Sequence, residues 1–172
     1  MYIAAFSLPQ IAIACECARL PQLAHEPLAL AGDDGVLSAV SEEAASFGIQ
    51  AGMTASTARC LCQGLIVLPY DRATYNEAAE SVWNLLAVES SVVEPISPEL
   101  AFMEITGADA LQRVRDVAKA LAAHVRTPVF VGIGRSKLVA EHAAHSPRQH
   151  DKGLTATVMA VPVGQEAQCL AC

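Results

Sequence analysis

The stretch Val93–Gly107, VEPISPELAFMEITG, reads as two β-strands joined by a Ser-Pro-Glu-Leu step. Its apolar residues recur at the spacing of half-buried strands: Ile96, Ala101, Met103 and Ile105. The step between the strands carries one acid, Glu99, and the next residue is Leu100. A centre that holds two metal ions needs several carboxylates converging on one point, so this step alone supplies too few.

Short strands and helices alternate on both sides of this stretch. The pattern predicts strands at 2–6, 27–31, 36–40, 65–68, 92–96, 100–105 and 128–133, and helices at 11–20, 41–47, 54–61, 71–90, 108–125 and 136–144. The turn Gly32–Gly35 indicates a hairpin, and Ser41 is placed to cap the helix that follows. We expect the strand at 65–68 to be buried and the polar stretch 145–153 to be a loop.

The order of these elements indicates an α+β fold. From residue 82 onward the order is helix, strand, strand, helix, strand, helix. Together with the first strand and helix, this order resembles a ferredoxin-like split βαβ plan. Residues from about 10 to 75 are then an inserted small α/β subdomain.

Length and composition allow one good core or two small lobes. The chain has 172 residues, of which 53% are hydrophobic. No apolar run approaches the roughly 20 residues of a membrane span, and the first residues lack the charged start of a secretory signal. We therefore expect a cytoplasmic protein.

The charge balance limits the partners. Eleven basic residues stand against eighteen acidic ones, and the net charge is −7. Proteins bind duplex DNA mainly by neutralising phosphates with Lys and Arg. We expect this segment alone to bind DNA weakly.

Six cysteines occur in pairs: Cys15/Cys17, Cys60/Cys62 and Cys169/Cys172. In a cytoplasmic chain they should be reduced, and we interpret them as small core hydrophobes. The alternative is a zinc site that organises an interaction module, but only the last pair has the usual C-x₂-C spacing.

Several blocks of sequence, in order, resemble one protein family. They are the first strand leading to Glu16, Pro27–Leu30, Ser41–Met53, Leu68–Asp71, Val93–Gly107 and Val131–Ala140. With these blocks the chain resembles the palm and fingers of Y-family (translesion, UmuC/DinB-like) DNA polymerases, and most of all the catalytically degenerate ImuB-like members. The resemblance implies a palm at 1–9 and 76–165, fingers at 10–75, and the start of a missing thumb at 166–172.

The resemblance also shows where catalytic groups are replaced. The family's first metal-binding Asp falls on Ser7, and its Asp-Glu pair falls on Glu99 and Leu100. The aromatic residue that excludes the ribose 2′-hydroxyl falls on Ala12. The residues that hold the triphosphate fall on Glu42, Ala45 and Glu141, and acids at such positions repel a nucleotide.

These replacements imply a non-catalytic adaptor in DNA repair and SOS mutagenesis. We expect it to bind no cofactor. At most, Glu99 remains as a single metal ligand. Arg135 and Lys137, with Arg148 and Lys152 downstream, are the candidates for weak phosphate contacts. The partners that the resemblance implies are DNA, a sliding clamp, an error-prone replicative-type polymerase and a recombinase-like accessory protein.

The alternative is an active error-prone polymerase that uses Mg²⁺ and an unusual ligand set, such as Glu99 with Glu16 or Glu104. Each of these residues also has a purely structural interpretation. Glu99 is expected to be a solvated charge at a strand end, and Ser7 a structural serine with no histidine or acid placed near it by the sequence. The histidines at 142, 145 and 150 are expected to lie at a solvated helix end rather than to bind metal.

Overall fold

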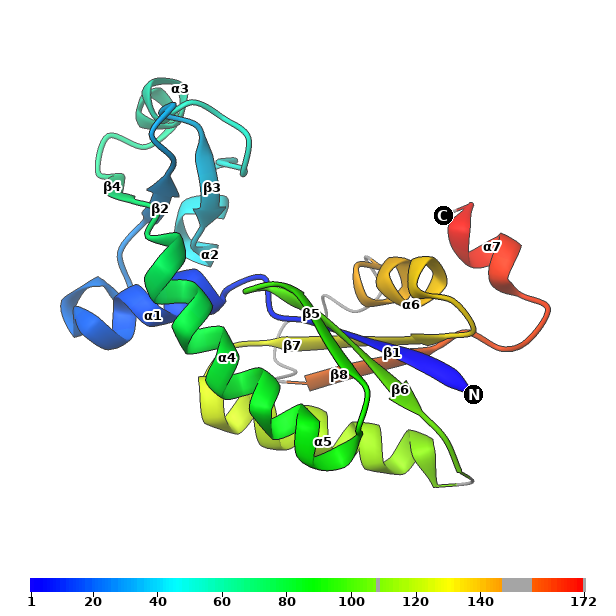
Figure 1. The fold of residues 1–172 in the computed structure, drawn as a ribbon. Coiled ribbons are helices and arrows are strands. Elements are labelled where there is room, and N and C mark those ends of the chain that lie inside the picture. Colours follow the sequence, from blue (N-terminus) through cyan, green and yellow to red (C-terminus); the bar gives the residue numbers. More distant parts are fainter. Residues whose placement is uncertain (108, 147–155, 172) are drawn as a thin grey trace. The chain divides into compact units, whose positions relative to one another are not determined.

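The computed structural model describes residues 1–107, 109–146 and 156–171. The chain forms two compact units: Met1–Pro9 with Asn76–Cys172, and Gln10–Tyr75 (Figure 1). Their bounds coincide closely with those of the palm and fingers that the sequence resemblance implies. The names palm and fingers, and the thumb at 166–172, stay predictions.

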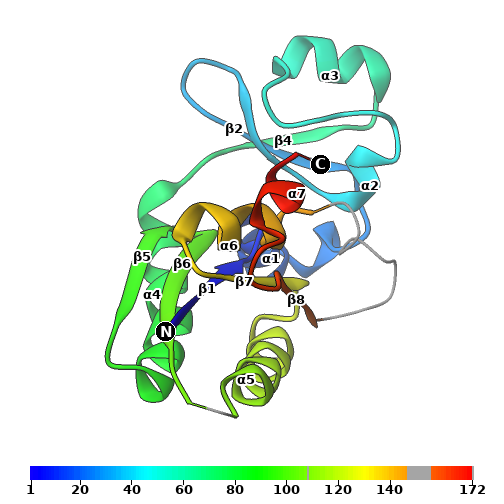
Figure 2. The same cartoon turned by 90° about the vertical axis from the view of Figure 1, so that its right-hand side faces the viewer.

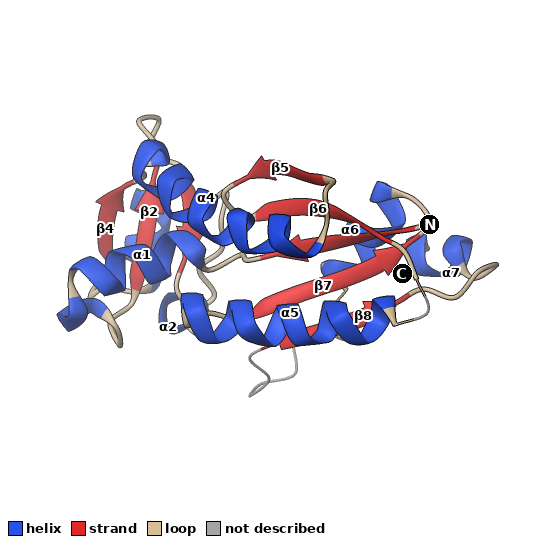
Figure 3. Ribbon diagram, turned by 60° about the horizontal axis from the view of Figure 1, so that its bottom comes forward, coloured by secondary structure: helices blue, strands red, loops and turns tan. Residues whose placement is uncertain are grey.

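The first unit is built on a five-stranded sheet with the order β5-β6-β1-β7-β8 (Figure 3). Its strands are β1 (Tyr2–Ser7), β5 (Val93–Ser97), β6 (Leu100–Ile105), β7 (Val129–Gly134) and β8 (Ala156–Ala160). β1 is antiparallel to both β6 and β7, whereas β7 and β8 are parallel. The order β5-β6-β1-β7 is that of the split βαβ plan, so the expected fold class is confirmed.

Helices cover both faces of this sheet. α5 (Ala110–Val125) and the part of α4 (Arg72–Glu89) that belongs to this unit lie on one face, and α6 (Lys137–Ala144) and α7 (Glu166–Leu170) lie on the other (Figure 2). α5 buries the residues that recur every three or four positions: Ala110, Val114, Ala118, Leu121 and Ala122. The apolar residues of this helix therefore lie on the face that packs against the sheet.

Two glycines allow α6 to lie directly on β7. A Cβ atom on Gly132 would be 1.9 Å from the carbonyl oxygen of Ala140, and one on Gly134 would be 2.7 Å from a methyl carbon of Val139. The hydroxyl of Ser136 accepts a hydrogen bond of 3.3 Å from the Val139 amide and caps the first turn. The close contact fixes where the last turn of α6 lies on the sheet.

The edge of the sheet at β5 is irregular. Its pairing with β6 shifts between Pro95 and Ser97, and most of the strand is exposed. Ile96, in the middle of this irregularity, leaves 55% of its surface accessible.

The second unit has a three-stranded sheet with the order β3-β2-β4. Its elements are α1 (Ile11–Arg19), a 3₁₀ turn η1 (Pro21–Leu23), β2 (Leu28–Ala31), β3 (Leu37–Val40), α2 (Glu42–Ala45), α3 (Ala55–Leu61) and β4 (Ile66–Pro69). The expected hairpin forms between β2 and β3, with Gly35 in a left-handed turn conformation at a φ of 74°. Ser41 and Thr54 cap α2 and α3 through their hydroxyls, as predicted for Ser41.

Some expectations were wrong. β4 is only partly buried, and it extends to Pro69. α2 ends at Ala45 and not at Phe47, because the chain turns through Gly48 at a φ of 81°. β8, η1 and α7 had no predicted counterpart, and most of the loop expected at 145–153 lies outside the described residues. Among the helices of the described ranges, none has the length and hydropathy to cross a bilayer.

Candidate functional site

Three of the predicted site residues meet at one end of the first unit's sheet. Ser7, the last residue of β1, is paired with Leu100, the first residue of β6. The amide of Leu8 donates a hydrogen bond of 2.8 Å to the carbonyl oxygen of Glu99. The structure therefore brings Ser7, Glu99 and Leu100 together, and Glu99 is the one carboxylate among them.

Glu99 is not the freely solvated charge that the sequence suggested. Its side chain is half-buried at the β5–β6 turn. Burial raises the pKa of the Glu99 carboxyl, and the nearby His145 imidazole opposes that rise. A partly desolvated carboxylate is destabilised unless a positive group lies close to it.

Ser7 has a histidine neighbour, contrary to the expectation from the sequence. Its side chain is buried, with 2% of the residue exposed, and its Oγ lies 3.3 Å from Nε2 of His145. The other ring nitrogen, Nδ1, lies 2.9 Å from the carbonyl oxygen of Glu141. A carbonyl can only accept, so Nδ1 carries a hydrogen, and in the neutral ring Nε2 accepts from the Ser7 hydroxyl.

Of the other acids proposed as metal ligands, Glu104 does not join this site. Glu104 is paired with Ile3 and lies four residues along β6 from Leu100, which is about 13 Å at the rise of a strand. Glu16 belongs to the second unit, where it is buried and accepts a hydrogen bond of 2.7 Å from the Tyr75 hydroxyl. The sheet end of the first unit therefore does not fit a pair of magnesium ions.

The cysteines do not form a metal cluster in the part of the chain that the structure describes. Within it, no group of three or more His, Cys, Asp or Glu side chains could hold an ion. Cys15 and Cys17 are partly buried, and burial raises the pKa of both thiols. Cys172 lies outside the described residues, so the C-x₂-C pair stays a prediction.

The positions that the resemblance assigns to nucleotide binding are spread over both units. In the second unit Ala12 is fully buried in α1, whereas Glu42 and Ala45 are exposed one turn apart on α2. In the first unit Glu141 lies partly exposed on α6. These side chains offer no donor to a triphosphate, because two are methyl groups and two are acids.

The predicted phosphate-binding residues lie at the start of α6. Arg135 is exposed, and Lys137 forms an ion pair with Glu94 on β5. The Lys137 ammonium also lies 5.5 Å from the centre of the Phe102 ring. The charge of Lys137 is thus partly neutralised within the protein, and Arg148 and Lys152 lie outside the described residues.

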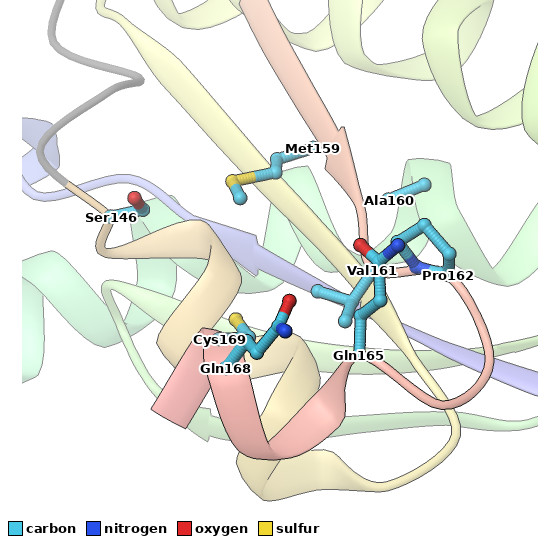
Figure 4. A pocket seen from close by; sticks show the side chains of 8 residues that line it. All are labelled: Ser146, Met159, Ala160, Val161, Pro162, Gln165, Gln168 and Cys169. Carbon is cyan, nitrogen blue, oxygen red and sulfur yellow. The ribbon is translucent and has the colours of Figure 1, made fainter. Parts of the chain in front are cut away.

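A cavity of about 230 Å³ lies apart from these residues in the first unit. Figure 4 shows the side chains from β8, the turn after it and α7 that surround it, with Ser146 after α6: Ser146, Met159, Ala160, Val161, Pro162, Gln165, Gln168 and Cys169. Of the residues singled out from the sequence, Cys169 of the candidate zinc pair lines it, whereas none of the degenerate catalytic or nucleotide-binding positions does.

Comparison with known proteins identifies the family. The model of the impB/mucB/samB family matches residues 8–145. The DNA polymerase IV of Dehalococcoides mccartyi is 29% identical over 167 residues, which cover 92% of this chain and 41% of that protein. The DNA polymerase IV 2 of Mesorhizobium japonicum is 34% identical over 129 residues, which cover 72% of this chain and 31% of that protein.

Solved structures share the fold. A post-insertion binary complex of Dbh DNA polymerase superposes with a TM-score of 0.84 at 18% identity, over 99% of this chain and 50% of that one. DinB from Sulfolobus solfataricus superposes with a TM-score of 0.78 at 20% identity, over 93% of this chain and 48% of that one. The chain spans about two fifths of the length of the curated relative it matches from Dehalococcoides mccartyi. The chain belongs to the impB/mucB/samB family and has the fold of the amino-terminal palm and fingers region of Y-family, DNA polymerase IV-like translesion polymerases.

Proposed function

We propose that this chain is the palm and fingers of a non-catalytic Y-family polymerase-like protein, of the ImuB-like kind, that serves as an adaptor in DNA-damage tolerance. One observation carries the proposal. At the end of β1 and the start of β6, where the resemblance implies three acids, the chain has Ser7, Leu100 and a single carboxylate, Glu99.

The chemistry of nucleotidyl transfer supports this interpretation. Two metal ions bridge the attacking and leaving oxygens, and they stay in place only when several carboxylates neutralise them. One half-buried carboxylate beside an imidazole does not supply that charge. The acids Glu42 and Glu141 add repulsion at positions that the resemblance assigns to triphosphate donors.

The proposed partners follow from the resemblance. They are DNA, bound weakly through Arg135 and Lys137, a sliding clamp, an error-prone replicative-type polymerase that performs the synthesis, and a recombinase-like accessory protein. The net charge of −7 favours binding through such partners over direct capture of a DNA duplex. In this proposal the protein acts in the cytoplasm, and α7 belongs to the start of a thumb.

A primer-extension assay tests the proposal. The full-length protein is incubated with a primed template, all four nucleotides and Mg²⁺ or Mn²⁺, with a DNA polymerase IV as the positive control. We expect no incorporation above background. Incorporation by the wild-type protein that the Glu99→Ala variant loses would contradict the proposal.

The second candidate function is that of an active error-prone polymerase. The family match and the identity to proteins named DNA polymerase IV favour it. It requires two bound ions under about 4 Å apart. A crystal soaked with Mn²⁺ and a nucleotide distinguishes the two functions, because anomalous scattering locates each ion. Two such peaks beside Glu99 would favour the polymerase.

A further inference from the structure

We propose that His145 is a positioning residue that takes the place of a metal ion at the end of β1: its imidazole binds Ser7, faces Glu99 and keeps divalent ions out. This inference rests on the proposed function, because it explains how a polymerase-like sheet end is completed without metal. The match to the family model ends at residue 145, so His145 is its last residue.

The hydrogen bonds hold the ring at both nitrogens. Nδ1 donates to the carbonyl oxygen of Glu141 over 2.9 Å, one turn earlier on the same helix. Nε2 lies 3.3 Å from the Ser7 hydroxyl. Because Ser7 is only 2% exposed, its hydroxyl depends on a protein partner, and His145 provides it across 138 positions of sequence.

The imidazole occupies the position that an ion would need. The half-buried Glu99 belongs to the same sheet end, because its carbonyl oxygen accepts a hydrogen bond of 2.8 Å from the amide of Leu8, the neighbour of Ser7. With the ring 3.3 Å from the Ser7 hydroxyl, an ion held jointly by residue 7 and Glu99 would have to displace it.

The packing of α6 places the ring. Gly132 lets the last turn of the helix approach β7 to contact distance, and Ala143 and Ala144 are buried in that contact. His145 follows directly as the residue that ends α6. Its position relative to Ser7 is therefore set by the backbone of a helix whose inner face is packed on β7, rather than by a free loop.

The test introduces an acid at position 7 and measures whether His145 prevents that acid from binding a metal ion. Binding of Mn²⁺ alone to residues 1–172 is measured by electron paramagnetic resonance of the free ion. The proteins are the wild type, Ser7→Asp, Ser7→Asp with His145→Ala, and Ser7→Asp with His142→Ala. His142 is the matched control, because it lies one turn earlier on α6 and has no hydrogen bond to Ser7 in the structure.

We expect no saturable Mn²⁺ binding by the wild type. The carboxylate introduced by Ser7→Asp should pair with His145 in the single variant, so removal of His145 should tighten Mn²⁺ binding about tenfold, which is about 1.4 kcal/mol. Removal of His142 should leave the affinity of the Ser7→Asp protein unchanged. A further protein, Ser7→Asp with His145→Gln, keeps an amide for hydrogen bonding without the imidazole ring, and it replaces the alanine variant if that variant does not fold.

Two results would overturn the inference. One is equal Mn²⁺ affinity of Ser7→Asp with and without His145. The other is saturable binding of Mn²⁺ or Zn²⁺ by the wild type that His145→Gln abolishes, because His145 would then be a metal ligand. Primer extension by the wild type would contradict the proposed function, whereas the comparison between the Ser7→Asp proteins would still decide the role of His145.

Discussion

The hydroxyl of Tyr75 donates a hydrogen bond of 2.7 Å to Oε1 of Glu16, and both residues are almost completely buried in the second unit. Oε2 of the same carboxylate lies 3.0 Å from Arg19, in an ion pair that lacks the geometry of a hydrogen bond. The buried charge of Glu16 thus depends on Tyr75 for its hydrogen bond. These two partners explain how Glu16 of α1 can be buried in the core of its unit.

The Tyr75→Phe variant should lower the free energy of unfolding by about 1–3 kcal/mol, because it leaves a buried carboxylate oxygen without its donor. Urea unfolding at neutral pH measures the effect. Tyr2→Phe is the control, since Tyr2 is 39% exposed and lies in the other unit. Equal unfolding free energies of Tyr75→Phe and the wild type would contradict this reading of the network.

Tyr75 should also make the folded protein less stable at alkaline pH. Burial, and then the hydrogen bond to Glu16, raise the pKa of Tyr75 above its ordinary value. The folded state therefore holds this proton more tightly than the unfolded state, so the stabilisation is complete below about pH 10 and is lost as the pH rises beyond it. Thermal unfolding followed from pH 8 to pH 11, approximate limits around that ordinary tyrosine pKa, should show a decline in the wild type that Tyr75→Phe reduces. A decline of equal size in both proteins would assign it to other groups.

The Glu99→Gln variant should be at least as stable as the wild type at neutral pH. Burial raises the pKa of Glu99, so the folded state favours the protonated carboxyl, and ionisation costs stability as the pH rises through the folded pKa. The advantage of the glutamine should shrink as the pH falls below about 4, where both states are protonated. Urea unfolding at the two pH values measures this, and Glu89→Gln is the exposed control. A large loss of stability at neutral pH would show that the Glu99 carboxylate is needed for folding.

The Gly132→Ala variant should destabilise the protein by about 1–3 kcal/mol, as expected for overpacking. Its Cβ would overlap with backbone atoms of α6, which cannot rotate away. Gly64→Ala is the control, because a Cβ there meets no atom within 4 Å. Thermal unfolding of both variants measures the difference, and a wild-type midpoint for Gly132→Ala would mean that α6 lies farther from β7 than in the structure.

The ion pair between Lys137 and Glu94 should limit binding to DNA. The Glu94→Gln variant should bind a duplex a few-fold more tightly and make the salt dependence steeper by about one unit, because it frees one ammonium for a phosphate. Fluorescence anisotropy at two salt concentrations measures both effects. Lys119→Ala, on the opposite face of the sheet, should change neither. Unchanged affinity of Glu94→Gln would exclude Lys137 as a phosphate contact.

Local sequence patterns predicted most of the fold. The hairpin of β2 and β3 follows from the glycines at 32 and 35, and the strands around Glu99 follow from their alternation. β8 was missed because its partner is the parallel strand β7, and parallel pairing leaves no turn signal nearby. Its short segment also follows a polar stretch that hides the start of the strand.

The site was less accessible to sequence reasoning. Ser7 and Leu100 could be placed together because they end and begin strands of one sheet. The contact of Ser7 with His145 has no local signal, since it joins residues 138 positions apart and depends on the packing of α6. The one sequence feature that could have indicated this contact is that His145 follows two alanines at the end of a predicted helix. The roles of Ala12, Glu42, Ala45 and Glu141 stay predictions.

The border of the sheet at β5 has a consequence for assembly. Pro95 has no amide hydrogen to donate, and the break in pairing before Ser97 interrupts the regular row of backbone groups. Another chain therefore finds no continuous ladder here on which to add a strand. A protein that recognises this border has to do so through side chains such as Ile96, and the fold is protected there against self-association into extended sheets.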